Sequence, residues 1–240
     1  IQNIALTEVA EFMTGDRVMS PPLVSLALRN RFNPALDGTW FMGVMELINN
    51  VTMLSIVLTG AALIREREHG TIEHLLVLPL KPVEIMLAKV WAMGAVVLLA
   101  TALALQFVLQ DILHMPVSGS VGLFLAGCAL HLFATTSMGI YLGTVARSMP
   151  QMGLLMILVL LPLQILSGGM TPRESMPDLV RYLMMGAPTT HFVSFAQAIL
   201  YRGADLSIVW PDFAAIGLIG MAFFAAALKR FRSTVSSMQG

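Results

Sequence analysis

The feature that most constrains the fold is a series of apolar segments about as long as a bilayer is thick. A helix needs about 20 apolar residues to cross the hydrocarbon core. Five segments meet or approach this length, at residues 41–64, 90–109, 121–143, 150–168 and 211–228. Barrel strands would alternate apolar and polar residues, which these segments do not. We therefore predict five transmembrane helices.

Composition supports the same class of protein. Hydrophobic residues make up 57% of the chain and charged residues 12%, whereas soluble domains carry about 25% charge. The 14 basic and 14 acidic residues cancel, so no long-range field attracts nucleic acid. A single cysteine, Cys128, excludes an internal disulfide and a cysteine zinc site. The expected fold is an all-α polytopic protein within a lipid bilayer.

The distribution of lysine and arginine predicts the orientation. If residues 65–89 are cytoplasmic, basic residues outnumber acidic ones on that side and acidic residues dominate the other. Cytoplasmic flanks normally carry the basic excess. We therefore expect residues 41–232 to form a membrane domain, with the N-terminus outside and a cytoplasmic tail at 233–240.

Residues 1–40 have a different character. They contain no apolar span, and residues 23–32 partly alternate after Pro21-Pro22 before ending at Asn33-Pro34. This pattern favours a strand followed by a turn. We expect the C-terminal remnant of an α/β exterior domain, in a fragment that lacks an N-terminal span.

The segment between the first two predicted spans, residues 65–89, carries the most information. Gly70 allows the chain to turn as it leaves the first span. Residues 71–78 can form two helical turns, which Pro79 ends, and Pro82 suits the first turn of the next helix.

The short helix would have an apolar face made of Ile72, Leu75 and Leu76. An apolar face rimmed by charge is suited to docking a partner protein. The alternative is a solvated connector that only supplies charge to the cytoplasmic flank.

Three sequence patterns carry a family resemblance. The first is the end of the predicted strand at Phe32-Asn33-Pro34. The second is E-R-E-x-G-T-x-E-x-L-L-x-x-P at Glu66 to Pro79, followed by Lys89. The third runs from Ser167-Gly168-Gly169 through Pro172, Met176-Pro177 and Pro188 to His191-Phe192. In this order the patterns resemble the type-2 permeases of ATP-binding-cassette exporters, bacterial drug-efflux branch. The resemblance covers residues 23–232.

The resemblance implies a set of partners and a location. It implies a permease in a bacterial inner membrane, paired with a second permease subunit as a homo- or heterodimer, and it leaves a periplasmic adaptor open. A separate ATP-binding subunit would hold ATP and Mg, because no G-x-x-x-x-G-K-[ST] phosphate loop occurs here. No cofactor or metal is expected on this chain. The residues implied to couple to the ATPase are Glu68, Gly70, Thr71, Ile72, Glu73, Leu75, Leu76 and Pro79.

Polar residues within the spans form two further candidate sites. Glu46, Asn49 and Asn50 share one helical face in the first span. They would line a translocation path or a dimer seam; alternatively Glu46 reaches the outer interface and the asparagines bind neighbouring helices. His131 and Thr135 also share a face, which favours a helix-packing hydrogen bond over a proton relay.

The segment before the last span is predicted to form an outer gate. Its helix-breaking and turn residues are Ser167, Gly168, Pro172, Pro177 and Pro188. They prevent one long helix, yet residues 179–185 and 192–200 are apolar enough to bury. Short re-entrant helices satisfy both conditions. The alternative is a plain exterior loop on the headgroups.

Other functions fit the sequence less well. A metalloprotease needs H-E-x-x-H, whereas the histidines of Glu68-His69 and Glu73-His74 are five residues apart. A channel would show a repeated pore filter, and none is visible. A membrane scaffold that does not transport, but is coupled to an ATPase, remains an alternative to the exporter. The sequence does not identify a substrate.

Overall fold

The computed structural model describes residues 38–70 and 81–239, with side chains to residue 232. The chain divides into two units, residues 1–37 and 38–240, and the described residues belong to the second. The predicted strand at 23–32 and the predicted coupling helix at 71–78 lie outside the described residues. Every regular element in the described part is a helix, which confirms the all-α class for that part.

Five helices are long and apolar enough to cross a membrane. They are α2 (Gly38–Glu68), α4 (Pro82–Leu103) with its π-helical continuation η1 (Ala104–Ile112), α5 (Val121–Val145), α6 (Met149–Leu166) and α9 (Leu206–Gln239). The number of spans is as predicted, but α2, α4 and α9 are longer than the apolar runs. Charged residues that favour helix extend these helices beyond the apolar runs. Hydropathy indicates which residues lie in lipid, but it does not indicate where the backbone hydrogen bonds of a helix end.

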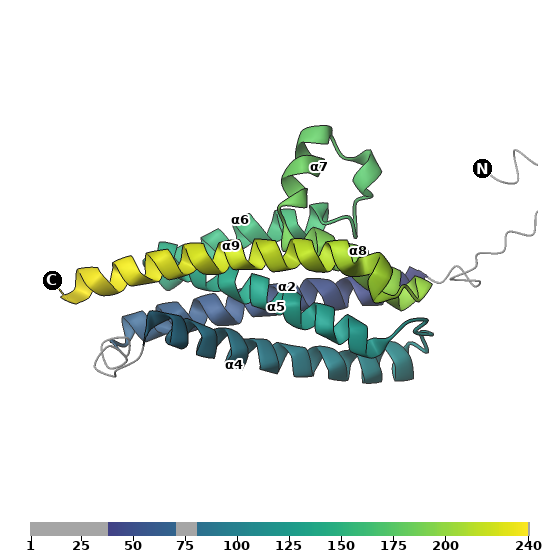
Figure 1. Cartoon of the computed structure of the whole chain (residues 1–240), viewed down its shortest axis with the longest axis horizontal. Helices are drawn as coiled ribbons and strands as arrows, with labels where there is room; N and C mark the ends of the chain where they lie inside the picture. Colours follow the sequence, from purple (N-terminus) through teal and green to yellow (C-terminus); the bar gives the residue numbers. More distant parts are fainter. Residues whose placement is uncertain (1–37, 71–80, 240) are drawn as a thin grey trace, which may run out of the picture. The chain divides into compact units, whose positions relative to one another are not determined.

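Three shorter helices connect α6 to α9. They are η2 (Arg173–Ser175), α7 (Asp178–Met185) and α8 (Pro188–Arg202). Figure 1 shows α7 standing away from the bundle, whereas α8 runs along it beside α9. Figure 1 also places the end of α2, the beginning of α4 and the C-terminal part of α9 at the same end of the bundle.

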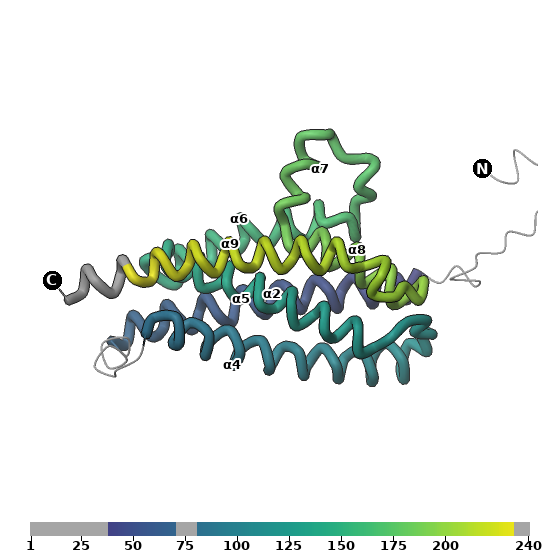
Figure 2. The backbone as a smooth tube through the Cα atoms, in the orientation of Figure 1, coloured from purple at the N-terminus to yellow at the C-terminus, as the bar shows by residue number. Residues whose placement is uncertain are grey.

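Helix α5 occupies the centre of the bundle. It packs against α2, α4, α8 and α9, and Figure 2 shows α2 and α5 between α4 and α9. Within its most apolar window 67% of the residues are buried, against 17% in α6 and α9. The outer faces of α4, α6 and α9 carry exposed large side chains such as Trp91, Leu158 and Leu218. These faces are the ones available to lipid.

Small residues allow α2 and α5 to approach closely. A Cβ atom on Gly139 would lie 2.7 Å from the carbonyl oxygen of Ile56, and one on Gly143 would lie 3.1 Å from that of Gly60. Glycine is therefore needed at these positions of α5, because a side chain would meet the backbone of α2.

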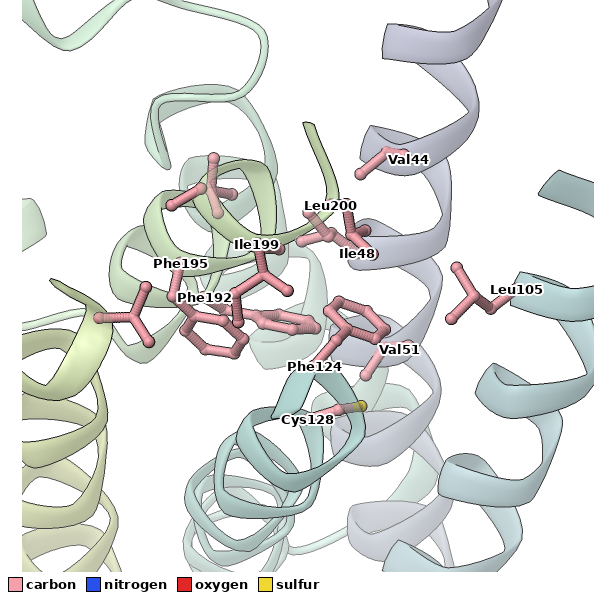
Figure 3. Packing of buried hydrophobic residues seen from close by; sticks show 14 of the residues in the cluster. Val44, Ile48, Val51, Leu105, Phe124, Cys128, Phe192, Phe195, Ile199 and Leu200 are labelled. Atoms are coloured by element: carbon pink, nitrogen blue, oxygen red, sulfur yellow. The ribbon is translucent and has the colours of Figure 1, made fainter. Parts of the chain in front are cut away.

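An aromatic cluster packs α8 against α5. The rings of Phe124, Phe192 and Phe195 are fully buried, and Figure 3 shows them gathered between the two helices. The ring centroids of Phe124 on α5 and Phe192 on α8 are 6.1 Å apart, within the range of favourable aromatic pairs. This cluster makes α8 part of the core, although α8 is too short to be a span.

Candidate functional site

The end of α2 carries a run of charged residues from Arg65 to Glu68. The last three of them each contact a different helix. Glu66 is the first: both of its carboxylate oxygens pair with Nζ of Lys89 on α4. The Glu66 and Lys89 side chains are 28% and 15% exposed, so this ion pair is only partly screened by water. It fastens the end of α2 to the beginning of α4.

Arg67 contacts the end of α5. Its Nη1 donates to the carbonyl of Ala146 at 2.7 Å, and its Nη2 donates to the carbonyl of Gly143 at 2.8 Å. The last carbonyls of a helix lack partners within the helix and carry partial negative charge. A guanidinium at this position therefore both completes their hydrogen bonds and complements the dipole.

Glu68 contacts the beginning of α6. Its Oε1 accepts a hydrogen bond from the backbone N–H of Met149 at 3.3 Å. The first N–H groups of a helix are unpaired and carry partial positive charge, which a carboxylate stabilises. The backbone N–H of Arg147 donates to Oε1 of Gln151 at 2.8 Å. The junction between α5 and α6 is therefore stabilised by Glu68 of α2 and by Gln151 of α6 itself.

These contacts define a charged clasp made of Glu66, Arg67, Glu68 and Lys89. Through it, α2 is tied to α4, α5 and α6 at one end of the bundle. The positive Arg67 contacts the C-terminal end of α5, and the negative Glu68 contacts the N-terminal end of α6, so both charges complement the helix dipoles. Glu68 belongs to the coupling residues implied by the resemblance; the guanidinium contacts of Arg67 were not predicted.

Both flanks of the segment 71–80 are anchored in the same region. Gly70 has a φ of +69°, a left-handed conformation that favours glycine, and its N–H donates to the carbonyl of Arg67 at 3.2 Å. On the other flank, Pro82 begins α4 and the N–H of Lys81 donates to Oε2 of Glu84 at 2.8 Å. The turn at Gly70 and the helix start at Pro82 are as predicted. Thr71, Ile72, Glu73, Leu75, Leu76 and Pro79 lie outside the described residues.

The polar face of α2 divides in two. Nδ2 of Asn50 donates to Oε1 of Glu46 at 2.7 Å, and Glu46 is exposed. Oδ1 of Asn49 is buried and has no hydrogen-bond partner among the described residues. Glu46 therefore points out of this bundle, whereas Asn49 points into it. Their role in a path or a dimer seam stays a prediction.

Deeper in the bundle, two side-chain hydrogen bonds join α2 to α5. Oγ1 of Thr52 lies 3.0 Å from Nε2 of His131, and Oγ of Ser55 donates to Oγ1 of Thr135 at 2.7 Å. All four side chains are fully buried. This geometry is that of helix packing, as favoured for His131 and Thr135. Thr52 and Ser55 were missed, although their spacing of three residues matches one helical face.

The outer-gate segment contains the short helices that were expected. Pro172 precedes η2, Pro177 precedes α7 and Pro188 begins α8, while Ser167 is buried and Gly168 has a φ of +97°. Helix α8 is buried as expected, but α7 is largely exposed. Leu179, Tyr182 and Leu183 are 73%, 65% and 69% exposed. No described element of the chain covers that face of α7, so burial of 179–185 in the outer leaflet stays a prediction.

His191 connects this segment to the last span. Its Nδ1 lies 2.9 Å from Oδ1 of Asp212 on α9, and its Nε2 lies 2.9 Å from the carbonyl oxygen of Met185 at the end of α7. The hydrogen bond to Asp212 is the main influence that raises the pKa of His191.

Comparison with known proteins decides the family. Residues 12–201 match the model of the ABC-2 type transporter family. The chain belongs to this family. The match includes α2 to α8, and with them the charged clasp and the outer-gate segment. Membership confirms the resemblance drawn from Glu66 to Pro79 and from Ser167 to Phe192.

Named relatives in this family are themselves membrane permeases. The chain is 63% identical, over 238 residues, to "Inner membrane transport permease YhhJ" of Escherichia coli (strain K12); the alignment covers 99% of the chain and 64% of that relative. It is 28% identical over 211 residues to "Probable multidrug ABC transporter permease YbhR" of the same organism, covering 88% of the chain and 57% of the relative. The chain thus spans less than two thirds of the length of these ABC-2 permeases.

Proposed function

We propose that this chain is the transmembrane permease subunit of an ABC exporter in the inner membrane of a bacterium. A separate ATP-binding subunit, which holds ATP and Mg, drives a substrate outward, and a second permease subunit completes the path. The relatives support the permease role because they are named as transport permeases and not as enzymes. The segment 71–80 and the C-terminus face the cytoplasm, as the basic residues predict.

The observation that carries the proposal is the charged clasp. The segment 71–80 is connected to α2 on one side and to α4 on the other, and the clasp joins these ends to α5 and α6. A displacement of this segment by an ATP-binding subunit would therefore move four spans together. The alternative, a solvated connector that only supplies charge to the cytoplasmic flank, would not require its flanking residues to contact the ends of α5 and α6.

Helix α6 gives the movement a route to the outer side. Glu68 holds its first residue, Met149, and its last residue, Leu166, leads directly into the outer-gate segment at Ser167. A shift or tilt of α6 would thus reach Gly168 and the short helices beyond it. In this proposal the segment from Ser167 to Pro188 opens and closes the outer end of the path.

The first test places a photo-crosslinking residue at Leu76. With a candidate ATP-binding subunit coexpressed, we expect crosslinks at position 76 and none at Ile208, an exposed apolar residue of α9 near its start. Crosslinks at positions near Arg147, with none at 76, would contradict the docking assignment.

The same complex separates the exporter from the scaffold. An exporter hydrolyses ATP faster when its substrate is present, and inverted vesicles accumulate that substrate. A library of amphiphilic compounds supplies the candidates. An ATPase that binds at position 76 but whose hydrolysis responds to none of them, in a complex that moves none, would favour the scaffold.

A further inference from the structure

A second cluster lies far from the clasp, where α7, α8 and α9 meet beside the outer-gate segment. His191 is the fourth residue of α8, and its two ring nitrogens reach two other helices. Nδ1 lies 2.9 Å from Oδ1 of Asp212 on α9, and Nε2 lies 2.9 Å from the carbonyl oxygen of Met185 on α7. One side chain of α8 therefore contacts both α7 and α9.

Both partners of the His191 ring are hydrogen-bond acceptors. A carbonyl oxygen and an ionised carboxylate offer lone pairs and no proton. A neutral imidazole has one N–H and one lone pair, so it can donate to only one of them. The imidazolium has two N–H groups and donates to both. The observed geometry is thus complete only when His191 carries a positive charge.

The surroundings favour that charge. The hydrogen bond that the His191 ring donates to Asp212 is the main cause that raises the pKa of His191 above its usual value of 6.5, and the bond to the Met185 carbonyl adds to it. Partial burial and the positive charge of Arg173, in η2, act in the opposite direction. The His191 and Asp212 side chains are 13% and 23% exposed, so water screens the pair only weakly.

Helix α7 depends on this contact because little else holds it. Its exposed face carries Leu179, Tyr182 and Leu183, and Met184 is its only fully buried side chain among those described. The N–H groups of Gly186 and Ala187 donate to the carbonyls of Leu183 and Met184. The Met185 carbonyl is one of the final carbonyls that a helix cannot pair internally, and His191 supplies its donor.

We propose that His191 is a protonation-dependent latch, which fixes α7 to α8 and α9 as the imidazolium and releases α7 when the ring is neutral. The sign follows from the direction of the shift. A group whose pKa is raised by folding stabilises the folded contact fully below its ordinary pKa, and this stabilisation is lost as the pH rises through the raised value. Helix α7 is therefore held at mildly acidic pH and freed at alkaline pH.

The test measures access to the buried side of α7 in the full chain, reconstituted in liposomes. A Cys128→Ser background carries either Met184→Cys, on the buried side, or Leu183→Cys, on the exposed side. Both are labelled with an impermeant maleimide between pH 5.5 and 9. The ratio of the two rates cancels the ordinary effect of pH on thiol reactivity. We expect this ratio to rise about tenfold with pH, as one charge-assisted hydrogen bond is lost.

Two substitutions give opposite signatures. His191→Ala removes the latch, so the ratio is high at every pH. Asp212→Asn offers an amide that donates to a neutral ring or accepts from a charged one, so the ratio stays low at every pH. A ratio that does not change with pH in the parent protein, or that still changes in Asp212→Asn, overturns the proposal. No ATP-binding subunit or substrate takes part, so the result is independent of the proposed function.

Discussion

Replacing Gly139 by alanine is expected to lower the midpoint of thermal unfolding more than any other single methyl group added to α5 toward α2. The new Cβ would lie 2.7 Å from the carbonyl oxygen of Ile56 and 3.1 Å from its Cα atom. Both are backbone atoms, so α2 and α5 must separate. Overpacking of this kind costs about 1–3 kcal/mol, and the Ser55–Thr135 hydrogen bond lies one turn away.

Gly153→Ala is the matched control. It adds the same methyl group to a helix of the same bundle, but nothing lies within 4 Å of the new atom. Because alanine favours helix over glycine by up to about 1 kcal/mol, the control should unfold at the same temperature or higher. The midpoint is read from intrinsic fluorescence in detergent. Equal midpoints for the two variants would mean that α2 and α5 are not in such close contact.

Replacing Arg67 by methionine is expected to have an effect of similar size, where the end of α2 meets the end of α5. Methionine keeps the unbranched apolar stem of the side chain but removes the donors to Ala146 and Gly143. Hydrogen bonds to charged groups contribute about 1.5–3 kcal/mol each. Since Arg67 is partly exposed and water can replace part of the loss, we expect a total of about 2–4 kcal/mol.

Arg65→Met removes the same charge from the same helix end and serves as its control. Arg65 is exposed, and surface charges of this kind change stability by less than about 0.5 kcal/mol. The two midpoints should therefore differ clearly, and the difference should persist at high salt because the Arg67 contacts are short and partly buried. If both variants unfold together, Arg67 does not close the end of α5.

The spans could be predicted because continuous apolar runs have few other solutions in lipid. Their ends could not be predicted, because a hydropathy pattern marks only the apolar run, whereas α2 continues through the charged residues to Glu68 and α9 begins at Leu206. The starts of η2, α7 and α8 follow directly from Pro172, Pro177 and Pro188, since proline stops one helix and suits the first turn of the next.

The candidate site was predicted only in part. The E-R-E pattern could be recognised as part of the family motif. The acceptors of Arg67, however, are backbone carbonyls near the end of α5, and every residue has a backbone carbonyl, so the sequence does not indicate them. Glu66 and Lys89 are 23 residues apart and lie on different helices, so their spacing in the sequence does not indicate a contact. Burial of residues 179–185 was inferred from their apolar character, and the structure gives α7 an apolar face that no described element of the chain covers.

The most direct test of the account asks whether the clasp carries movement from one end of the bundle to the other. Glu66→Lys and Lys89→Glu each place like charges together, whereas the double variant restores an ion pair of reversed direction. Each is combined with Cys128→Ser and Met184→Cys, and maleimide labelling is followed in liposomes that contain the ATP-binding subunit, with and without ATP.

We expect ATP to change the labelling rate at position 184 in the parent protein, neither single variant to show the change, and the double variant to recover it. Binding of the ATP-binding subunit, measured by crosslinking at position 76, should be equal in all four proteins. An ATP-dependent change that persists in both single variants would contradict the claim that the charged clasp couples the spans.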